Sequence, residues 1–338
     1  GTGTDFSYWD APAVTSLSPA SGPIAGGQTV TITGSGFNAV SAVRFGATAA
    51  TSFTVNSATQ ITAVTPAGSI GTFDVTVTAT GGTSVTDGTG NDYRYFGIPV
   101  VTSLSTAVGP TTGGTSVTIT GTNLLGATSV TVGSTAATFS VVSDTSITFT
   151  TPARAAGTVN VQVTTPGGAS STTGLADDFT FYDAPTVTAL SPTKSALAGT
   201  TVTVTGTNFV SGLTTVTFGG TAGTSVNVVS ATSLSVVAPA GSAGTVNVQV
   251  TTPGGASSTS GTADDFTYWA APTVTLLAPT GGPLVGGTSV VITGTNFDGV
   301  SGAAAVKFGA VNATSYTVNS TTQITAVAPA GSAGTVDV

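Results

Sequence analysis

The sequence repeats itself four times, and this repetition limits the fold more than any other feature. The phrase APAVTSLSP at residues 11–19 recurs as IPVVTSLS, APTVTALSP and APTVTLLAP. The second residue of each phrase is a proline, and these prolines are spaced by 87, 86 and 87 residues along the 338-residue chain. The motifs between them keep the same order. We therefore expect one small domain per repeat instead of one large domain.

The repeats also predict the domain boundaries. We assign residues 1–10 to the closing strand of a preceding repeat. The following segments are named repeats 1 to 4, and they cover residues 11–97, 98–183, 184–270 and 271–338. Repeat 4 stops at TVDV, so it is expected to be incomplete at its C-terminal end.

Each repeat is a series of short segments in which apolar and polar residues alternate. In TVTITG, Val30 and Ile32 fall on one side and the threonines on the other, and GTVNVQVT at residues 244–251 shows the same period of two. This pattern is typical of antiparallel strands with one face in a core and one in water. Gly-rich turns such as GPIAGG at residues 22–27 separate the strands. The sequence therefore predicts an all-β protein of tandem immunoglobulin-like β-sandwiches, arranged as an elongated rod.

The order of motifs resembles the IPT/TIG family of immunoglobulin-like domains. Each repeat runs through versions of SPxxGPxxGGTxVTITGTNF, VxFG, ITAxxPAG, GTVxVxVTTPGG and DFTY, except that the given sequence stops within the fourth of these in repeat 4 and does not reach the fifth. Repeat 3 departs at SALAG (195–199) and repeat 2 at ST (105–106), which changes only turn detail. The resemblance implies the sandwich fold. It implies no single function, because such domains occur in surface receptors, bacterial adhesins, transcription factors and glycan-active enzymes.

Composition argues against several classes of function. The chain has no Cys and no His, which removes disulfides, thiolate nucleophiles and the commonest general base and metal ligand. Its net charge is −8 and it has five Lys and Arg residues, so a nucleic-acid partner is not expected. It also has no apolar run long enough to predict membrane insertion within this segment.

Two pairs of adjacent carboxylates are the best candidates for chemistry, namely Asp177–Asp178 and Asp264–Asp265. Adjacent strand residues face opposite ways, whereas a glycosidase needs two carboxyl groups facing one sugar. Calcium binding would need further oxygen ligands, and no DxDxDG loop is present. We interpret these residues as solvated turn residues. The sequence thus predicts no catalytic residue, no metal site and no cofactor.

The two ends of the chain share an unusual relationship. TDFSYWDAP at residues 4–12 resembles ADDFTYWAAP at residues 263–272, the closing strand of repeat 3, whereas repeat 4 has no such strand. We favour the interpretation that the chain is a window from a longer array. The alternative is strand exchange, in which residues 5–9 complete repeat 4 of another copy. That fit is expected to be imperfect, because repeat 4 lacks two strands and the N-terminus offers one.

The junctions between repeats are short and aromatic. Only Ala270 and Ala271 separate the closing strand of repeat 3 from the next proline, and no Gly/Ser linker is present. We expect one ring of each closing aromatic pair to pack in the core and the other to wedge between neighbouring repeats. The predicted junction residues are Trp9, Pro12, Phe96, Pro99, Tyr182, Pro185, Trp269 and Pro272.

These features predict a non-catalytic structural protein, extracellular or on the cell surface, that forms a rod, stalk or filament. Neutral Ser and Thr faces would permit self-association of copies or of neighbouring repeats. Two alternatives stay open. One is an adhesin or glycan-binding module that recognises a cell-surface or glycan ligand. The other is an accessory region of a large secreted enzyme.

Overall fold

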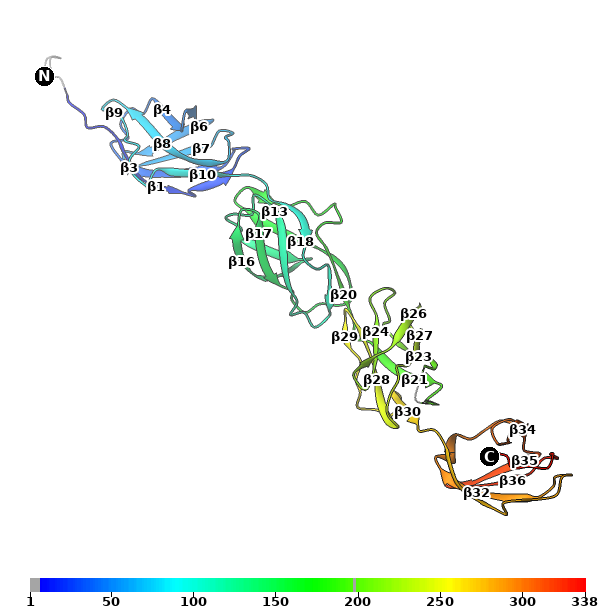
Figure 1. The fold of residues 1–338 in the computed structure, drawn as a ribbon. Coiled ribbons are helices and arrows are strands. Elements are labelled where there is room, and N and C mark those ends of the chain that lie inside the picture. Colours follow the sequence, from blue (N-terminus) through cyan, green and yellow to red (C-terminus); the bar gives the residue numbers. More distant parts are fainter. Residues whose placement is uncertain (1–6, 197–198) are drawn as a thin grey trace. The chain divides into compact units, whose positions relative to one another are not determined.

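The computed structural model describes residues 7–196 and 199–338. It divides into two compact units, one ending at Tyr182 and the other beginning at Asp183, and each is described by itself. The predicted all-β class is confirmed, because the described residues form strands, one short 3₁₀ helix and no α-helix (Figure 1). None of the described residues belongs to a helix with the length and apolarity needed to cross a bilayer.

The first unit contains repeats 1 and 2, with ten strands each. Repeat 1 contains β1 (Ala13–Ser18), β2 (Ser21–Pro23), β3 (Thr29–Ser35), β4 (Ala42–Phe45), β5 (Thr48–Ala49), β6 (Ser52–Ser57), β7 (Gln60–Val64), β8 (Gly71–Ala79), β9 (Gly82–Thr83) and β10 (Asp92–Phe96). Repeat 2 contains β11 (Val100–Leu104), β12 (Val108–Pro110), β13 (Ser116–Thr122), β14 (Ser129–Val132), β15 (Thr135–Ala136), β16 (Thr138–Ser143), β17 (Ser146–Thr150), β18 (Gly157–Thr165), β19 (Gly168–Ala169) and β20 (Asp178–Tyr182).

The second unit contains repeats 3 and 4. Repeat 3 contains β21 (Thr186–Ser191), β22 (Lys194–Ala196), β23 (Thr201–Thr207), β24 (Thr215–Phe218), β25 (Thr221–Ala222), β26 (Thr224–Ser230), β27 (Ser233–Val237), β28 (Gly244–Thr252), β29 (Gly255–Ala256) and β30 (Asp265–Trp269). Repeat 4 contains β31 (Thr273–Ala278), β32 (Ser289–Thr295), the 3₁₀ helix η1 (Phe297–Gly299), β33 (Lys307–Phe308), β34 (Val311–Asn312), β35 (Ser315–Ser320) and β36 (Gln323–Val327).

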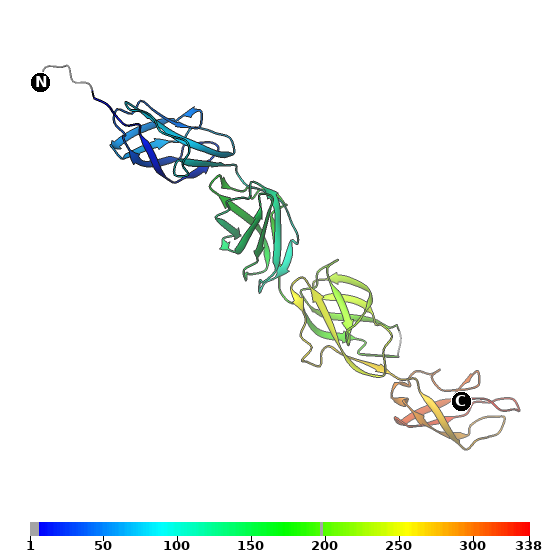
Figure 2. The same ribbon diagram turned by 60° about the vertical axis from the view of Figure 1, so that its left-hand side comes forward.

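Repeats 1, 2 and 3 share one topology of two facing sheets (Figure 2). In repeat 1 the first sheet has the order β1-β3-β7-β6, and the second has the order β2-β10-β8-β4-β5 with β9 added to β8. All pairings are antiparallel except that of β2 with the closing strand β10, which is parallel. The closing strand β10 therefore lies between β2 and β8 and pairs with both of them.

The core fills the space between the two sheets, and the alternating pattern decides which side chains enter it. In repeat 1, Val30 and Ile32 of β3 are fully buried, while the threonines between and beside them are less buried or exposed. The closing strand contributes Tyr93 and Tyr95, which lie edge to face with their ring centroids 5.0 Å apart. Burying two such rings in each of repeats 1, 2 and 3 is a large part of the apolar area that stabilises a domain of this size.

The turn that follows β2 shows why glycine is needed there. Gly26 and Gly27 both have positive φ, at 71° and 80°, and the corresponding glycines of repeats 2 and 4 do the same. Gly26 also lies directly against the backbone of Pro66, where a side chain would clash. The GPxxGG phrase is therefore a turn that brings the second sheet close to the first.

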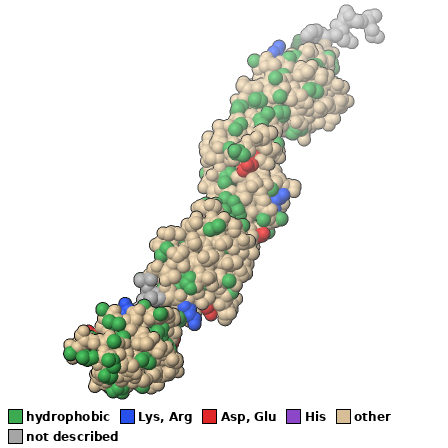
Figure 3. All heavy atoms as spheres, turned by 90° about the vertical axis from the view of Figure 1, so that its right-hand side faces the viewer, with side chains coloured by type: hydrophobic (Ala, Val, Ile, Leu, Met, Phe, Trp, Pro, Cys, Tyr) green, Lys and Arg blue, Asp and Glu red, His purple; other side chains and the backbone are tan. Residues whose placement is uncertain are grey.

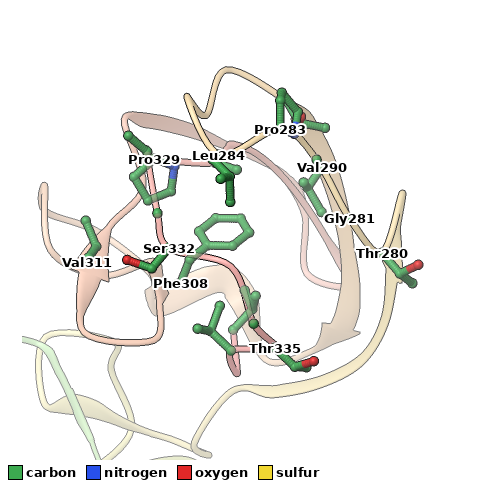
Figure 4. A pocket seen from close by; sticks show the side chains of 18 of the residues that line it. Thr280, Gly281, Pro283, Leu284, Val290, Phe308, Val311, Pro329, Ser332 and Thr335 are labelled. Atoms are coloured by element: carbon green, nitrogen blue, oxygen red, sulfur yellow. The ribbon is translucent and has the colours of Figure 1, made fainter.

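Repeat 4 forms only part of this sandwich within the described chain. Its first sheet is present, with the order β31-β32-β36-β35, but its second sheet is reduced to the pair β33-β34. Its buried cluster still includes Val290, Ile292, Phe297 and Ile324, which correspond to core positions of the other repeats. Within the described chain its apolar interior is consequently less covered, and a pocket lined by Leu284, Phe308 and Pro329 opens there (Figure 4).

Candidate functional site at the repeat junctions

The closing strand of each complete repeat carries two neighbouring rings that point to opposite sides. The inner ring is buried in all three, as Tyr95, Phe181 and Tyr268. The Tyr95 hydroxyl donates a hydrogen bond to the Pro66 carbonyl at 2.9 Å, and the Tyr268 hydroxyl donates to the Pro239 carbonyl at the same distance. The inner ring is therefore a core residue, and where it is a tyrosine it also ties the closing strand to the opposite sheet.

In repeats 1 and 3 the outer ring lies at the surface of its own repeat and contacts the next repeat of the same unit. Within the first unit, a Cβ built on Gly126 would lie 2.5 Å from the Phe96 ring. Within the second unit, a Cβ built on Gly299 would lie 2.6 Å from Cζ3 of Trp269. Gly126 and Gly299 occupy the same place in their repeats, five residues after the glycine of the ITGTN motif (residues 119–123 and 292–296). Each ring thus packs on a glycine that leaves room for it.

An asparagine of the following repeat holds the segment that crosses each junction. The Asn123, Asn208 and Asn296 side-chain amides donate hydrogen bonds to the carbonyl of the residue before the junction proline, at 3.0, 2.8 and 3.1 Å. All three asparagines have a left-handed backbone with φ between 57° and 60°, which Asn tolerates better than most residues. This role was not predicted from the sequence, although the TN dipeptide recurs at this place in repeats 2, 3 and 4.

The junction prolines differ in burial. Pro12, Pro99 and Pro185 are buried, whereas Pro272 is exposed. In repeat 2 the hairpin between β18 and β19 approaches this region, because Gly167 lies against the carbonyls of Phe96 and Gly97. Repeat 4 has no counterpart of that hairpin among its described residues, so Pro272 borders a hollow of about 360 Å³ instead.

The remaining predicted junction residues, Trp9 and Tyr182, lie at the two ends of the first unit. Trp9 is 53 % exposed, and residues 7–12 form no strand. The first six residues, which include part of the predicted closing strand, lie outside the described residues. The carbonyls of Trp9 and Asp10 lie against Gly81 of repeat 1, as those of Phe96 and Gly97 lie against Gly167 of repeat 2. Tyr182 is half-buried, and its carbonyl accepts a hydrogen bond from the Thr111 amide at 2.9 Å.

Two outer rings have a cation over them. The Arg94 guanidinium carbon lies 4.7 Å from the centroid of the Phe96 ring, and Lys194 Nζ lies 5.4 Å from the Trp269 ring. Such contacts stabilise the ring position by about 0.5–1 kcal/mol at exposed sites. The inner rings are instead buried in the core and lie away from water. Burial, and then the neighbouring Tyr93, raise the pKa of Tyr95 to about 12, and burial raises the pKa of Tyr268.

The paired carboxylates are placed differently from our expectation. Asp177 and Asp264 are each only 3 % exposed, so the interpretation as solvated turn residues is wrong for the first member of each pair. They are buried because the segment that carries them folds back onto β18 in repeat 2 and onto β28 in repeat 3. There the Asn160 side chain donates a hydrogen bond to Asp178, and the Asn247 side chain donates one to Asp264, each at 3.0 Å. Asn91 takes the same place in repeat 1. Among the described residues, no three His, Cys, Asp or Glu side chains are grouped so that they could hold a metal ion.

Comparison with family profiles decides what kind of domain these repeats are. The profile of the IPT/TIG domain matches residues 12–95, 99–181, 185–268 and 272–338. The chain belongs to the IPT/TIG family. The four IPT/TIG repeats account for nearly all of its length, and domains of this type are immunoglobulin-like and non-catalytic in kind. A comparison with curated protein sequences gave no match.

Solved structures of similar fold include proteins of several kinds. The plexin A4 extracellular region is 21 % identical with a TM-score of 0.36, and the match covers 97 % of this chain but only 30 % of plexin A4. A surface protein, SGBP-B, from a xyloglucan utilisation locus of Bacteroides uniformis is 19 % identical (TM-score 0.25; coverage 62 % and 72 %). Invasin, a bacterial integrin-binding protein, is 15 % identical (TM-score 0.24; coverage 92 % and 72 %). These similarities are too low to indicate what this chain binds.

Proposed function

We propose that this chain is a non-catalytic structural protein, extracellular or on the cell surface, that forms a rod, stalk or filament. One observation carries the proposal. Within each unit, the outer ring of a closing strand packs directly on a glycine of the next repeat, Phe96 on Gly126 and Trp269 on Gly299. A flexible linker would instead separate domains by Gly- or Ser-rich residues without contacts. Repeats joined through packed side chains resist bending, which is what a stalk requires.

The surface supports the same proposal. Charged residues make up 5 % of the chain, and few of them appear on the face drawn in Figure 3. Neutral hydroxyl-rich faces have little like-charge repulsion, so copies of the chain can lie side by side. The proposed partners are therefore other copies of this chain or neighbouring repeats. No nucleic-acid partner is proposed, since such a role needs a basic face.

The absence of Cys from the sequence makes the mechanical proposal directly measurable. Ser260→Cys in repeat 3 and Thr321→Cys in repeat 4 provide two exposed sites for spin labels. We expect a narrow distance distribution between the labels. Inserting six Gly and Ser residues between Ala270 and Ala271 should broaden it, and this variant is the matched control. Equal breadth in both proteins would contradict the proposal.

Solution scattering and cell labelling test the rest. Four repeats in a row should give a maximum dimension on the order of 130 Å, whereas a compact arrangement would be far smaller. Antibody labelling of intact producing cells should detect the protein, and external protease should remove the signal. Binding to a glycan array, together with a broad label distribution, would favour the adhesin or glycan-binding alternative.

A further inference from the structure

The junction between repeats 1 and 2 carries a group of exposed apolar side chains. The chain crosses this junction directly after β10 (Figure 1). Ile70 of repeat 1 is 58 % exposed, and Ile98 of the crossing segment is 56 % exposed. Val100 and Leu125 of repeat 2 are 48 % and 38 % exposed. We call these four residues the collar. Single exposed apolar residues are common, but a group of them in one place marks an interaction surface.

Contacts around Asn123 bring the collar together at the crossing segment. The Asn123 side-chain amide donates a hydrogen bond to the Ile98 carbonyl at 3.0 Å. A Cβ built on Gly97 would lie 2.7 Å from Nδ2 of Asn123 and 3.0 Å from Cδ1 of Ile70. Ile70 of repeat 1 therefore lies next to the same asparagine of repeat 2 that holds Ile98.

The other two collar residues flank this asparagine in repeat 2. Val100 pairs with Thr122, the residue before it. Leu125 is two residues after it and is followed by Gly126, on which the Phe96 ring packs. The collar is therefore continuous with the packed contact that joins the two repeats, and it extends that contact to the surface.

The other repeats have mostly small or polar residues at the places of the collar. Ile70 is replaced by alanine in repeats 2, 3 and 4 (residues 156, 243 and 333), and Ile98 is replaced by alanine in the other three repeats (residues 11, 184 and 271). Val100 is replaced by alanine or threonine (residues 13, 186 and 273). Leu125 is replaced by Asn38, Val210 and Asp298. The asparagine and glycine contacts of a junction thus need no large apolar collar, and the collar is a feature of this one junction.

A cation and an anion flank the collar, one in each repeat. Arg94 of repeat 1 is exposed, and its guanidinium carbon lies 4.7 Å from the centroid of the Phe96 ring. Asp144 of repeat 2 is also exposed, and its Oδ1 accepts a hydrogen bond from the Leu125 amide at 3.3 Å. Both depart from the repeat pattern, which has threonine at the place of Arg94 (residues 180 and 267) and alanine or threonine at that of Asp144 (residues 58, 231 and 321). The chain has only five basic residues, so this placement gives the junction a distinct charge pattern.

We propose that the collar binds the collar of a second copy of the chain, with the two copies side by side and antiparallel. A two-fold axis through the collar places repeat 1 of one copy against repeat 2 of the other. Arg94 of each copy then faces the partner's Asp144, so the charges are complementary at both ends of the contact. A parallel arrangement would bring like charges together. The proposal deepens the self-association in the proposed function, on which it rests, by naming its site.

The apolar side chains supply the affinity and the charges decide the orientation. Four collar residues and their neighbours are fewer than the roughly 20–30 residues a side of a standard stable interface. The contact is therefore weak, and its occupancy depends on the concentration of the chain. Association of this kind suits rods that are held close together at a surface.

Sedimentation equilibrium of the 338-residue chain tests the site. We expect a mass that rises from one copy toward two with concentration, and loss of this rise in Ile70→Ser/Ile98→Ser. Val229→Ser is the matched control, because Val229 is 70 % exposed but lies in repeat 3. Association that is equal in the collar variant and the unchanged chain would overturn the collar while leaving self-association elsewhere intact. A chain that stays monomeric at every concentration would also overturn it, without affecting the rigidity measured between repeats 3 and 4.

Charge reversal tests the orientation while keeping the apolar residues. Arg94→Asp and Asp144→Arg should each weaken dimerisation about ten-fold at low ionic strength, because each acts at two symmetry-related contacts. The double variant should restore dimerisation to within about three-fold of the unchanged chain. Weakening that adds up in the double variant would overturn the antiparallel arrangement.

Cross-linking gives a direct measure of which surfaces meet. Thr72 is exposed and pairs with Arg94 between β8 and β10, and Thr145 is exposed beside Asp144. The chain has no Cys, so Thr72→Cys and Thr145→Cys each provide a single thiol. In a mixture of the two variants, a short bismaleimide should join unlike copies faster than like copies. Faster joining of like copies would show a parallel contact and would overturn the proposal.

Discussion

The side-chain amide of Asn123 donates a hydrogen bond to the Ile98 carbonyl at 3.0 Å, across 25 residues of sequence. Ile98 precedes Pro99, so this bond fixes the segment that crosses from repeat 1 to repeat 2 onto the body of repeat 2. Asn296 and the Ala271 carbonyl repeat the arrangement at the start of repeat 4. Repeat 1 has Gly36 instead, also with positive φ, and it packs on Pro12.

Asn123→Gly tests the role of this amide without straining the left-handed backbone. Glycine adopts that conformation freely, so the folded junction loses the side chain and its hydrogen bond, at a cost of about 1 kcal/mol for the bond. Hydrogen exchange should become roughly five-fold faster for the amides of the crossing segment and should stay unchanged in the core of repeat 2. Equal exchange in both proteins would show that the amide does not hold the junction.

Gly299→Ala tests the packing between repeats 3 and 4. The new methyl group would overlap the Trp269 ring, which must move by rotation or by separation of the repeats. We expect a cost of about 1–3 kcal/mol for the junction and a shifted Trp269 fluorescence, measured in a Trp9→Phe background. Gly281→Ala is the matched control, because no atom lies within 4 Å of a Cβ built there. An identical spectrum in the two variants would contradict the contact.

Tyr268→Phe tests the tie between the closing strand and the opposite sheet. The change removes the hydrogen bond to the Pro239 carbonyl and should destabilise repeat 3 by about 1 kcal/mol. Unfolding should be followed repeat by repeat with hydrogen exchange in urea, because a multidomain chain is not a two-state system. Tyr182→Phe, at the outer position of a closing strand, is the control and should have little effect.

Alkaline pH should unfold repeats 1 and 3 before repeat 2. The pKa of Tyr95 is about 12 in the folded chain against an ordinary value of 10, and the pKa of Tyr268 is also raised. Above pH 10 the unfolded chain therefore loses a proton that the folded chain keeps, so stability falls as pH rises from about 10 to 12. Repeat 2 has Phe181 at this position and lacks the effect. Tyrosinate absorbance and hydrogen exchange over this range provide the measurement, and simultaneous loss of all three repeats would contradict it.

Asp177→Asn should stabilise repeat 2 by about 1 kcal/mol. One carboxylate oxygen of Asp177 is buried without a hydrogen-bond partner in the described structure, and repeat 1 already has Asn91 at this place. Removing a buried, poorly satisfied charge is favourable. Asp144→Asn at an exposed turn is the control. Loss of stability in Asp177→Asn, together with stabilisation of the unchanged protein by calcium, would instead identify Asp177 as a cation ligand.

The sequence by itself determined the class of fold and the division into repeats. Alternation at Val30 and Ile32, and its recurrence in every repeat, is a local property that decides which side of a strand enters a core. The buried inner ring of each closing pair follows from the same rule, because neighbours in a strand point to opposite faces.

Tertiary structure alone decided the contacts on which the site depends. The hydrogen bond from Asn123 to Ile98, the seat of Trp269 on Gly299, and the burial of Asp177 all join residues that lie apart in sequence. Such pairings follow from strand register and from the path of the chain between sheets, and local patterns do not encode these distances.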